Sequence, residues 1–299
     1  MDYANSKVRS VFVAMIVHLL MIIPDLAAAV MANSLSMYSD VLKSGIELLA
    51  TVLSWLTLRR IEKGKHGMYE YGIGKFENMT SLAVAGVILV SVVIISYTAV
   101  SRLSEQVRLH EGGAYFAMVM MLIGVGVNFW LFKKNYRLSK KEYSPIMEAQ
   151  WRLFFTKILA DGSVLISLAL SIALSGYSWS IYIDPLSSFI LCGFLLHAMH
   201  SILTHSIGDL LDKTLDESMQ MVIVRELGKA FDEYRLLHGV RSRRSGSRIF
   251  IDIFLEFEPE KSMREVQDSI DRIKFSVEQQ IKGAQVLVAP CRICPAGQT

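Results

Sequence analysis

Cysteine is scarce in this chain, and the few cysteines do not form the pattern of a secreted scaffold. Only three occur in 299 residues, Cys192, Cys291 and Cys294, which excludes a disulfide framework and favours a reducing compartment for the last two. We expect no cleavable signal, because the first apolar run is too long and no small-residue cleavage site stands out. The sequence also has no nucleophile–base pair and no nucleotide-binding loop, since Gly72-Ile-Gly74 is too short to be one. We therefore do not expect an enzyme.

The chain also lacks a large excess of charge of either sign, whereas apolar residues are abundant. The net charge is only +3, but 52% of the residues are hydrophobic, which is too apolar for an ordinary soluble protein. Runs of about 20 apolar residues indicate membrane-spanning helices. Six such segments are present, at residues 11–32, 35–58, 79–103, 115–132, 153–174 and 181–203. We therefore expect a membrane α-helical fold with six transmembrane helices, the first two joined as a tight hairpin.

Lysine and arginine are concentrated in alternate connections between these segments. They precede the first segment and follow the second and the fourth, at 59–75 and 133–141, whereas the opposite side has only Arg102 and Arg108. Short loops rich in basic residues stay on the cytoplasmic side of a membrane. We therefore expect a multi-pass protein of the inner (cytoplasmic) membrane with both termini in the cytoplasm.

The composition changes after the sixth segment, and a different kind of domain is expected there. Amphipathic helices are predicted at 217–231 and 262–281, and alternating or apolar strands at 237–241, 248–257 and 285–289. This α-β-β-α-β order predicts a ferredoxin-like α+β domain in the cytoplasm, so the chain divides into residues 1–205 and 206–299. Residues 241–248 form a strongly basic turn, which is either a solvated hairpin or a contact for anionic lipid or acidic loops.

The second apolar segment carries charges that a membrane helix rarely tolerates. Asp40, Lys43 and Glu47 recur at nearly helical spacing, which places them near one face. Charged side chains at membrane depth are expensive and mark an ion pathway, a proton relay or a compensated pair. This segment is therefore the first candidate for a functional site.

Several motifs together resemble the cation diffusion facilitator family. Residues 34–47 read Ser-x-Ser-Met-Tyr-Ser-Asp-x-x-Lys-Ser-x-x-Glu, which looks like the family's Ser-x-Ala-Leu-Leu-Ala-Asp-x-x-His-Ser-x-x-Asp. Residues 69–77 resemble its His-x-Phe/Tyr-Gly-His-Gly-Lys-x-Glu loop, Asp184-Pro185 matches its Asp-Pro, and residues 208–216 resemble its Leu-Leu-Asp linker. The resemblance covers nearly the whole chain. It implies a homodimer that exchanges divalent metal ions for protons.

The resemblance also implies where a transported ion would lie. In the family, the second and fifth helices each supply two ligands one turn apart, commonly His or Asp followed by Asp. Carried over, these positions fall on Lys43 and Glu47 in the second helix and, through Ser144-Pro145 and Ala160-Asp161-Gly162, on Leu153 and Lys157 in the fifth. A protonated lysine has no lone pair, leucine has no donor atom, and two ammonium groups repel a dication. The scaffold is retained, but the metal site is altered or lost.

Further acidic side chains accompany these positions in the membrane segments. Asp25, Asp40 and Asp161 are expected near the two lysines and Glu47. Three interpretations remain open. The charges are internal ion pairs that fix the helix register, or carboxylates of a displaced cation site with a lysine that exchanges a proton, or paired lysines that accept an anionic or zwitterionic solute.

A second candidate metal site lies in the tail. His238 falls on a histidine of the family, and Cys291 and Cys294 form a CxxC pair that binds Zn²⁺ in some proteins, although two cysteines are only half a site. The family's other tail ligands are replaced, at Phe254, Leu287 and Ala289. His18, in the first segment, is interpreted as a hydrogen-bonded packing residue.

Two functions follow from the sequence. The first is a divergent transporter of the cation diffusion facilitator type, a divalent metal cation/proton antiporter with an altered transport site, for which Zn, Fe, Mn or Co is the substrate and no resident cofactor is certain. The alternative is a non-transporting structural or regulatory subunit that pairs with itself or with an active paralogue. Membrane lipid and a second copy of the chain, or a paralogue, are the expected partners. No nucleic acid is expected.

Overall fold

The chain folds into two compact units. A computed structural model describes residues 2–32, 35–62, 72–104, 111–141, 143–173 and 183–292. Contacts divide it into Met1–Ile207 and Gly208–Thr299. The first unit is helical and the second combines helices with a sheet.

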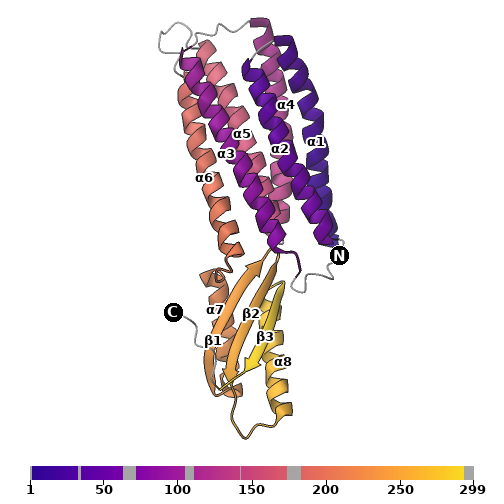
Figure 1. Ribbon diagram of the computed structural model, residues 1–299, viewed down its shortest axis with the longest axis vertical. Coiled ribbons are helices and arrows are strands. Elements are labelled where there is room, and N and C mark those ends of the chain that lie inside the picture. The colour runs from indigo at the N-terminus through magenta and orange to yellow at the C-terminus, as the bar shows by residue number, and fades with distance from the viewer. Residues whose placement is uncertain are drawn as a thin grey trace. The chain divides into compact units, whose positions relative to one another are not determined.

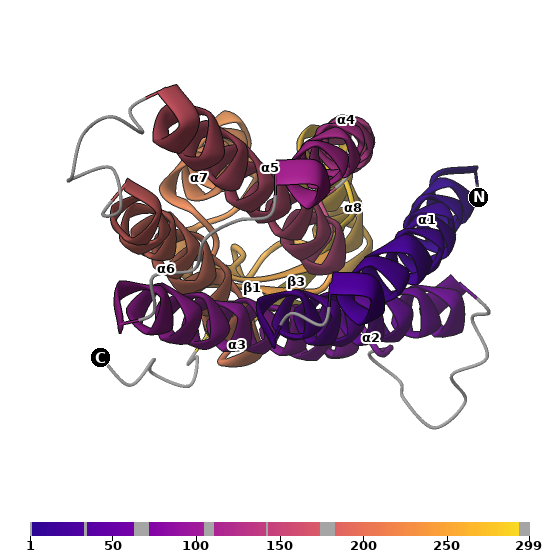
Figure 2. The same cartoon turned by 90° about the horizontal axis from the view of Figure 1, so that it is seen from above.

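In the described part of the first unit, six long helices are present (Figure 1). They are α1 (Asp2–Ala32), α2 (Leu35–Glu62), α3 (Lys75–Ser104), α4 (Glu111–Lys141), α5 (Pro145–Ala173) and α6 (Ile183–Leu210). Viewed along the helices, α1 lies beside α2, α4 beside α5, and α3 packs against both α2 and α5 (Figure 2). Each helix contains the described part of one predicted apolar segment, and most of the helices continue beyond it by one or more polar turns.

The outer faces of these helices are apolar, as a membrane requires. Within the described residues, four runs are long and apolar enough to cross a bilayer: Ser6–Ala27, Val41–Glu62, Lys75–Ser101 and Ser188–Leu210. Large apolar side chains point outward, for example Leu20, Ile23 and Leu49, which are 60%, 61% and 68% exposed. In water such a surface would aggregate, but it matches lipid tails. The predicted six-helix transmembrane fold is confirmed.

Buried polar side chains tie the helices together inside the bundle. Because the hydrophobic effect contributes little to the association of helices in lipid, close packing and hydrogen bonds between the helices fix their positions. Three such bonds are Ser10 Oγ to Asn135 Oδ1 at 2.8 Å, Gln150 Nε2 to Ser54 Oγ at 2.9 Å and Ser144 Oγ to Glu77 Oε2 at 2.5 Å. They join α1 to α4, α2 to α5 and α3 to the start of α5. This framework holds the helices that carry the charged positions.

The second unit is a three-stranded sheet with two helices on one face (Figure 1). Its elements are α7 (Glu217–Lys229), the short 3-10 helix η2 (Phe231–Glu233), β1 (Leu236–Ser245), β2 (Arg248–Glu256), α8 (Met263–Gln280) and β3 (Ala284–Pro290). The strand order is β1-β2-β3, with β1 antiparallel and β3 parallel to β2. The predicted α-β-β-α-β order is confirmed.

Alternation in β2 explains why this domain folds. Ile249, Ile251, Ile253 and Leu255 are buried against α7 and α8, while the residues between them are half-buried on the other face. The start of α8 is fixed by a capping box, in which Ser262 and Glu265 each bond the other's backbone N–H. The domain therefore has its own core and its own helix signals.

The basic turn is shorter than the sequence predicted. The turn was placed at 241–248, but β1 continues to Ser245, and Gly246, with φ of 61°, and Ser247 alone reverse the chain. The arginines of this stretch belong to a strand. Arg241 lies over the ring of Phe254 and Arg243 over that of Phe250, with 5.5 and 5.0 Å from Cζ to the ring centroids. Because these arginine side chains pack on phenylalanine rings of β2, strand β1 continues beyond its apolar residues.

Glu226 is expected to make the second unit sensitive to acid. Its carboxylate is 3% exposed and accepts bonds from Lys229 Nζ at 2.7 Å and Ser276 Oγ at 2.6 Å, which hold the pKa of Glu226 below its ordinary value of 4.5. A lowered folded-state pKa stabilises the unit fully above pH 4.5, and this stabilisation is lost as pH falls through the folded-state pKa.

Glu226→Gln should therefore weaken the unit near neutral pH by roughly 1–3 kcal/mol and flatten its dependence on acid. Hydrogen exchange of α7 and α8 peptides, corrected for intrinsic rates at each pH, measures both effects in the whole chain. Glu260→Gln, an exposed glutamate in the loop before α8, is the matched control. An unchanged acid profile in Glu226→Gln would contradict the assigned role.

Candidate functional site

A small cavity lies inside the helical unit where α2, α3, α5 and α6 meet. The volume that the centre of a water molecule can occupy there is about 10 Å³. This is enough space for roughly one water molecule. The residues around it are Lys43, Glu47, Ile88, Ser91, Leu153, Thr156, Lys157, Ala160 and Leu195. All four positions that the sequence singled out on the second and fifth helices are among them. Those positions, far apart in the chain, are brought to one place.

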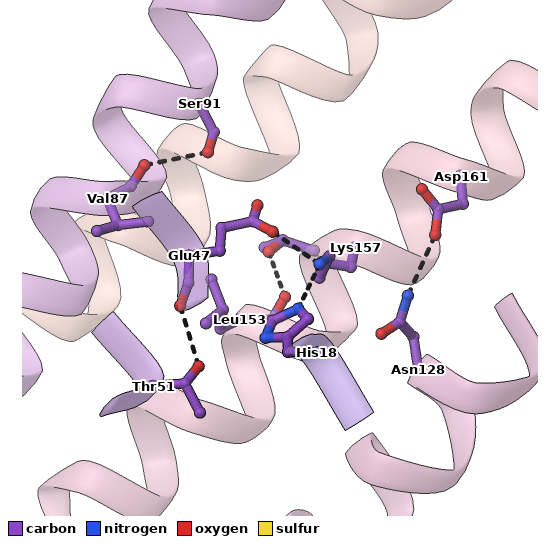
Figure 3. A network of polar contacts seen from close by, with 10 residues as sticks. His18, Glu47, Thr51, Val87, Ser91, Asn128, Leu153, Lys157 and Asp161 are labelled. Atoms are coloured by element: carbon purple, nitrogen blue, oxygen red, sulfur yellow. Dashed lines mark hydrogen bonds and ion pairs between the residues drawn. The ribbon is translucent and has the colours of Figure 1, made fainter. Parts of the chain in front are cut away.

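An ion pair spans this cavity. Lys157 Nζ lies 2.8 Å from Glu47 Oε2, and the two side chains are 12% and 3% exposed. Lys43, one turn before Glu47 on α2, also acts electrostatically on its carboxylate. Figure 3 shows the lysine of α5 reaching across to the glutamate of α2. A buried charge that loses its partner is strongly destabilising, so each side chain requires the other.

His18 of α1 completes this group of charges. Lys157 Nζ contacts His18 Nε2 as well as Glu47 Oε2, so the ammonium touches both an imidazole and a carboxylate (Figure 3). The Nε2 atom then accepts the bond, which puts the ring proton on Nδ1. That buried Nδ1 atom has no hydrogen-bond partner among the described residues. The sequence predicted that His18 is hydrogen-bonded, and it is. Its bonding partner is Lys157, however, so His18 belongs to the charged site and is more than a packing residue.

The helix contacts show how this geometry is set. Two turns beyond Glu47 on α2, Ser54 accepts a bond from Gln150, which lies two turns before Lys157 on α5. The two helices are therefore antiparallel. Lys157 reaches across to a carboxylate of the facing helix, which the length of a lysine side chain allows.

Two hydroxyl groups add oxygen atoms to the cavity wall. Thr156 Oγ1 donates to Leu153 O at 2.7 Å and Ser91 Oγ donates to Val87 O at 3.1 Å. Their protons are thus used within their own helices, which leaves oxygen lone pairs as acceptors. The cavity therefore offers oxygen atoms, and no imidazole or thiolate, at the residues that line it.

Asp161 lies one turn beyond Lys157 but turns toward α4. Its Oδ2 accepts a bond from Asn128 Nδ2 at 3.2 Å, and a Cβ on Gly124 would lie 3.6 Å from the same oxygen (Figure 3). Lys43 and Lys157 still interact with the carboxylate electrostatically. Asn128 was not considered from the sequence. A polar residue in a membrane segment was the signal that could have found it.

The remaining membrane charges are only partly described. Asp25 lies in α1 two turns beyond His18, and both Asp25 and Lys43 have further interaction partners. Asp40 lies in α2, but its side chain is outside the described part of the chain. The predicted network of these charges around Lys157 remains a prediction.

The four cavity positions do not form a tetrahedral zinc site. They supply one carboxylate, one alkyl chain and two ammonium groups, whereas zinc takes four N, S or O donors. Within the described residues, no three His, Cys, Asp or Glu side chains gather as a metal cluster. Any cation bound here must be held mainly by oxygen atoms and must compete with Lys157.

The candidate metal residues of the tail are placed as follows. His238 Nε2 lies 3.1 Å from Glu256 Oε2, so the imidazole pairs with a carboxylate across the hairpin. Cys291 is disulfide-bonded, in which state its sulfur is not a thiolate ligand, and Cys294 is outside the described residues. Cys192 is a free, buried thiol. Zinc binding in the tail remains a prediction.

Comparisons with known proteins agree with the fold. Residues 11–211 match the cation efflux transmembrane domain, and residues 217–290 match the cytoplasmic, dimerisation domain of cation efflux proteins. The chain is 23% identical to the cation-efflux pump FieF of Shewanella oneidensis, over 91% of this chain and 90% of that protein.

Two further relatives are similar over comparable lengths. FieF of Salmonella newport is 22% identical over 88% of this chain and 86% of its own, and protein p34 of Rickettsia rickettsii is 22% identical over 88% and 84%. The family matched is one of membrane transporters for cations. With both of its domains matched in order, the chain belongs to the cation efflux family of integral membrane proteins.

Proposed function

We propose that this protein exchanges a divalent metal cation for protons across a membrane through an altered transport site at the Lys157–Glu47 pair. The observation that carries the proposal is that Lys43, Glu47, Leu153 and Lys157 line one cavity. The ammonium group of Lys157 pairs with Glu47 in this cavity, where the family resemblance implies a metal ion. An arriving cation has to displace that charge.

The chemistry of the wall favours a particular kind of cation. Glu47 and the hydroxyl oxygens of Ser91 and Thr156 are hard donors, which suit Mn²⁺ better than soft-ligand ions such as Zn²⁺. Asp161, one turn along α5, supplies a second carboxylate if its bond to Asn128 opens. Among Zn²⁺, Fe²⁺, Mn²⁺ and Co²⁺, the site is therefore proposed to favour Mn²⁺.

The contacts of Lys157 support coupling to protons. The ammonium touches two acceptors, Glu47 and His18. When a dication takes the carboxylate, His18 Nε2 is the neighbouring acceptor for a proton of the displaced ammonium. Cation uptake and proton release would then use the same side chain, as antiport requires.

The arrangement in the cell is proposed from the same features. Basic residues at the ends of α2 and α4 favour an orientation in an inner membrane with both termini and the α+β domain in the cytoplasm. The matched dimerisation domain favours a homodimer. A heterodimer with a paralogue would use the same domain.

Flux in proteoliposomes tests this function. Purified protein with an imposed pH gradient is expected to move Mn²⁺, and Zn²⁺, Fe²⁺ and Co²⁺ more slowly. Glu47→Gln should lower the flux by roughly tenfold or more, because it removes the one carboxylate at the four positions. Glu148→Gln is the control, since Glu148 pairs with Arg152 on the same helix and does not line the cavity.

Two results would contradict the proposal. One is the absence of flux for any of the four ions, which would favour the non-transporting subunit. The other is a flux that Glu47→Gln leaves unchanged, which would place transport elsewhere in the protein.

A further inference from the structure

A second, larger pocket opens on the outside of the helical unit, between the start of α1 and the end of α2. Its volume is about 850 Å³, and it is lined by Ser6, Val8, Arg9, Phe12, Trp55, Arg59 and Glu62. Pockets of this size are typical of sites for small organic ligands. None of its residues belongs to the Lys157–Glu47 cavity. The pocket is therefore a separate feature.

Positive charge on one side of this pocket lacks an acidic partner. Among the described residues, neither Arg9 nor Arg59 forms an ion pair with a carboxylate, and Arg9 lies close enough to Lys134 to interact with it electrostatically. The guanidinium of Arg59 lies over the Trp55 ring, 5.0 Å from its centroid, which fixes its plane. Guanidinium groups held in this way bind phosphate through paired N–H donors. An anionic group is the natural occupant.

The other residues that line the pocket include an apolar and aromatic group. Phe12 and Trp55 are in contact, with ring centroids 5.5 Å apart, and Val8 lies one turn before Phe12. A wall of this kind suits hydrocarbon better than a free inorganic anion. The ligand should thus carry both a phosphate and an apolar chain.

The pocket also lies at the boundary of the membrane. The apolar spans of α1 and α2 are Ser6–Ala27 and Val41–Glu62, so the pocket residues occupy the terminal turns of both. Tryptophan and arginine are enriched at this depth, where headgroups meet hydrocarbon. A phospholipid presents its phosphate and the start of its chains at the same level.

Glu62 decides between headgroups. Its carboxylate lines the same pocket and would repel a second anionic group, but it matches an ammonium. A zwitterionic headgroup with a phosphate and a primary amine complements two guanidiniums and one carboxylate. We propose that this pocket binds phosphatidylethanolamine, with the phosphate at Arg9 and Arg59, the amine at Glu62 and an acyl chain against Phe12 and Trp55.

Native mass spectrometry of the full chain tests the proposal. The purified protein, delipidated in detergent, is titrated separately with phosphatidylethanolamine, phosphatidylglycerol and phosphatidylcholine of identical acyl chains. We expect phosphatidylethanolamine to bind at least about tenfold more tightly than the other two, which is a difference of about 1.4 kcal/mol. Inorganic phosphate should not compete with it.

Substitutions of the arginines and of Glu62 test the contacts to the phosphate and to the amine separately. Arg9→Gln/Arg59→Gln should lower phosphatidylethanolamine binding about tenfold or more, whereas Glu62→Gln should remove the preference over phosphatidylglycerol and leave phosphatidylglycerol binding intact. Arg137→Gln, an exposed arginine of α4 that does not line the pocket, is the control and should change nothing. All four substituted residues are at the surface, and thermal unfolding confirms that each variant is folded.

Three outcomes would overturn the proposal. They are equal binding of the three lipids, equal losses in Arg137→Gln and the double variant, and competition by inorganic phosphate. A preference for phosphatidylethanolamine that survives Glu62→Gln would overturn the assigned role of Glu62, and with it the choice of headgroup.

Discussion

Replacing Lys157 by methionine is expected to destabilise the helical unit by about 3–5 kcal/mol, because it leaves the carboxylate of Glu47 buried without its partner. Glu47 is 3% exposed and Lys157 is 12% exposed, so water cannot readily take over either charge. Methionine matches the length of the lysine stem, and the variant thus removes the charge with little loss of volume. Thermal unfolding of the purified chain in detergent measures the effect.

The matching test is to remove both charges. Because an apolar replacement of a whole buried ion pair is often neutral or stabilising, Glu47→Met/Lys157→Met should recover most of the lost stability. Lys133→Met, an exposed lysine on α4, serves as the control and should have little effect. A single variant as stable as the native chain, or a double variant that is additive, would show that the two side chains do not depend on each other.

Restoring ligands at the cavity is expected to create a zinc site. The variant Lys43→Asp/Leu153→His/Lys157→Asp, with Glu47 kept, would place three carboxylates and one imidazole around the same cavity. Without metal this variant should be less stable than the native chain, because like charges are buried together. Zn²⁺ at 100 times its dissociation constant should restore about 2.7 kcal/mol.

Calorimetric titration compares this variant with the native protein. The native chain has one carboxylate at these positions and is expected to bind Zn²⁺ on the order of 100-fold more weakly, a difference of about 2.7 kcal/mol. Leu153→His alone is the control, since it adds a donor but keeps both lysines. Equal zinc affinity in the native chain and the triple variant would mean that these positions do not form the ion site.

The overall architecture could be predicted because apolar length and period are local signals. Runs of apolar residues are long enough to identify each helix of the membrane unit, and alternation in β2 identifies its buried face. The end of β1 could not be predicted in this way. Its last residues, Arg241–Ser245, are polar, and their strand pairing with β2 depends on contacts between Arg243 and Phe250 that lie across the hairpin.

The site itself was predicted only in part. The spacing on two helices and the family register led to Lys43, Glu47, Leu153 and Lys157, which the structure brings to one cavity. Spacing along one helix says nothing about which neighbouring helix a side chain will contact. For this reason the sequence did not identify Asn128 on α4 as the hydrogen-bond partner of Asp161, and it treated His18 as packing although Lys157 contacts it.

An experimental structure of the protein with bound Mn²⁺ tests the altered transport site most directly. Manganese is located by its anomalous X-ray signal, independently of the side chains around it. The predicted result is one Mn²⁺ ion beside Glu47, with oxygen ligands and with Lys157 turned away from the carboxylate. Manganese bound elsewhere in the helical unit, with the Lys157–Glu47 pair intact at 2.8 Å, would contradict this account.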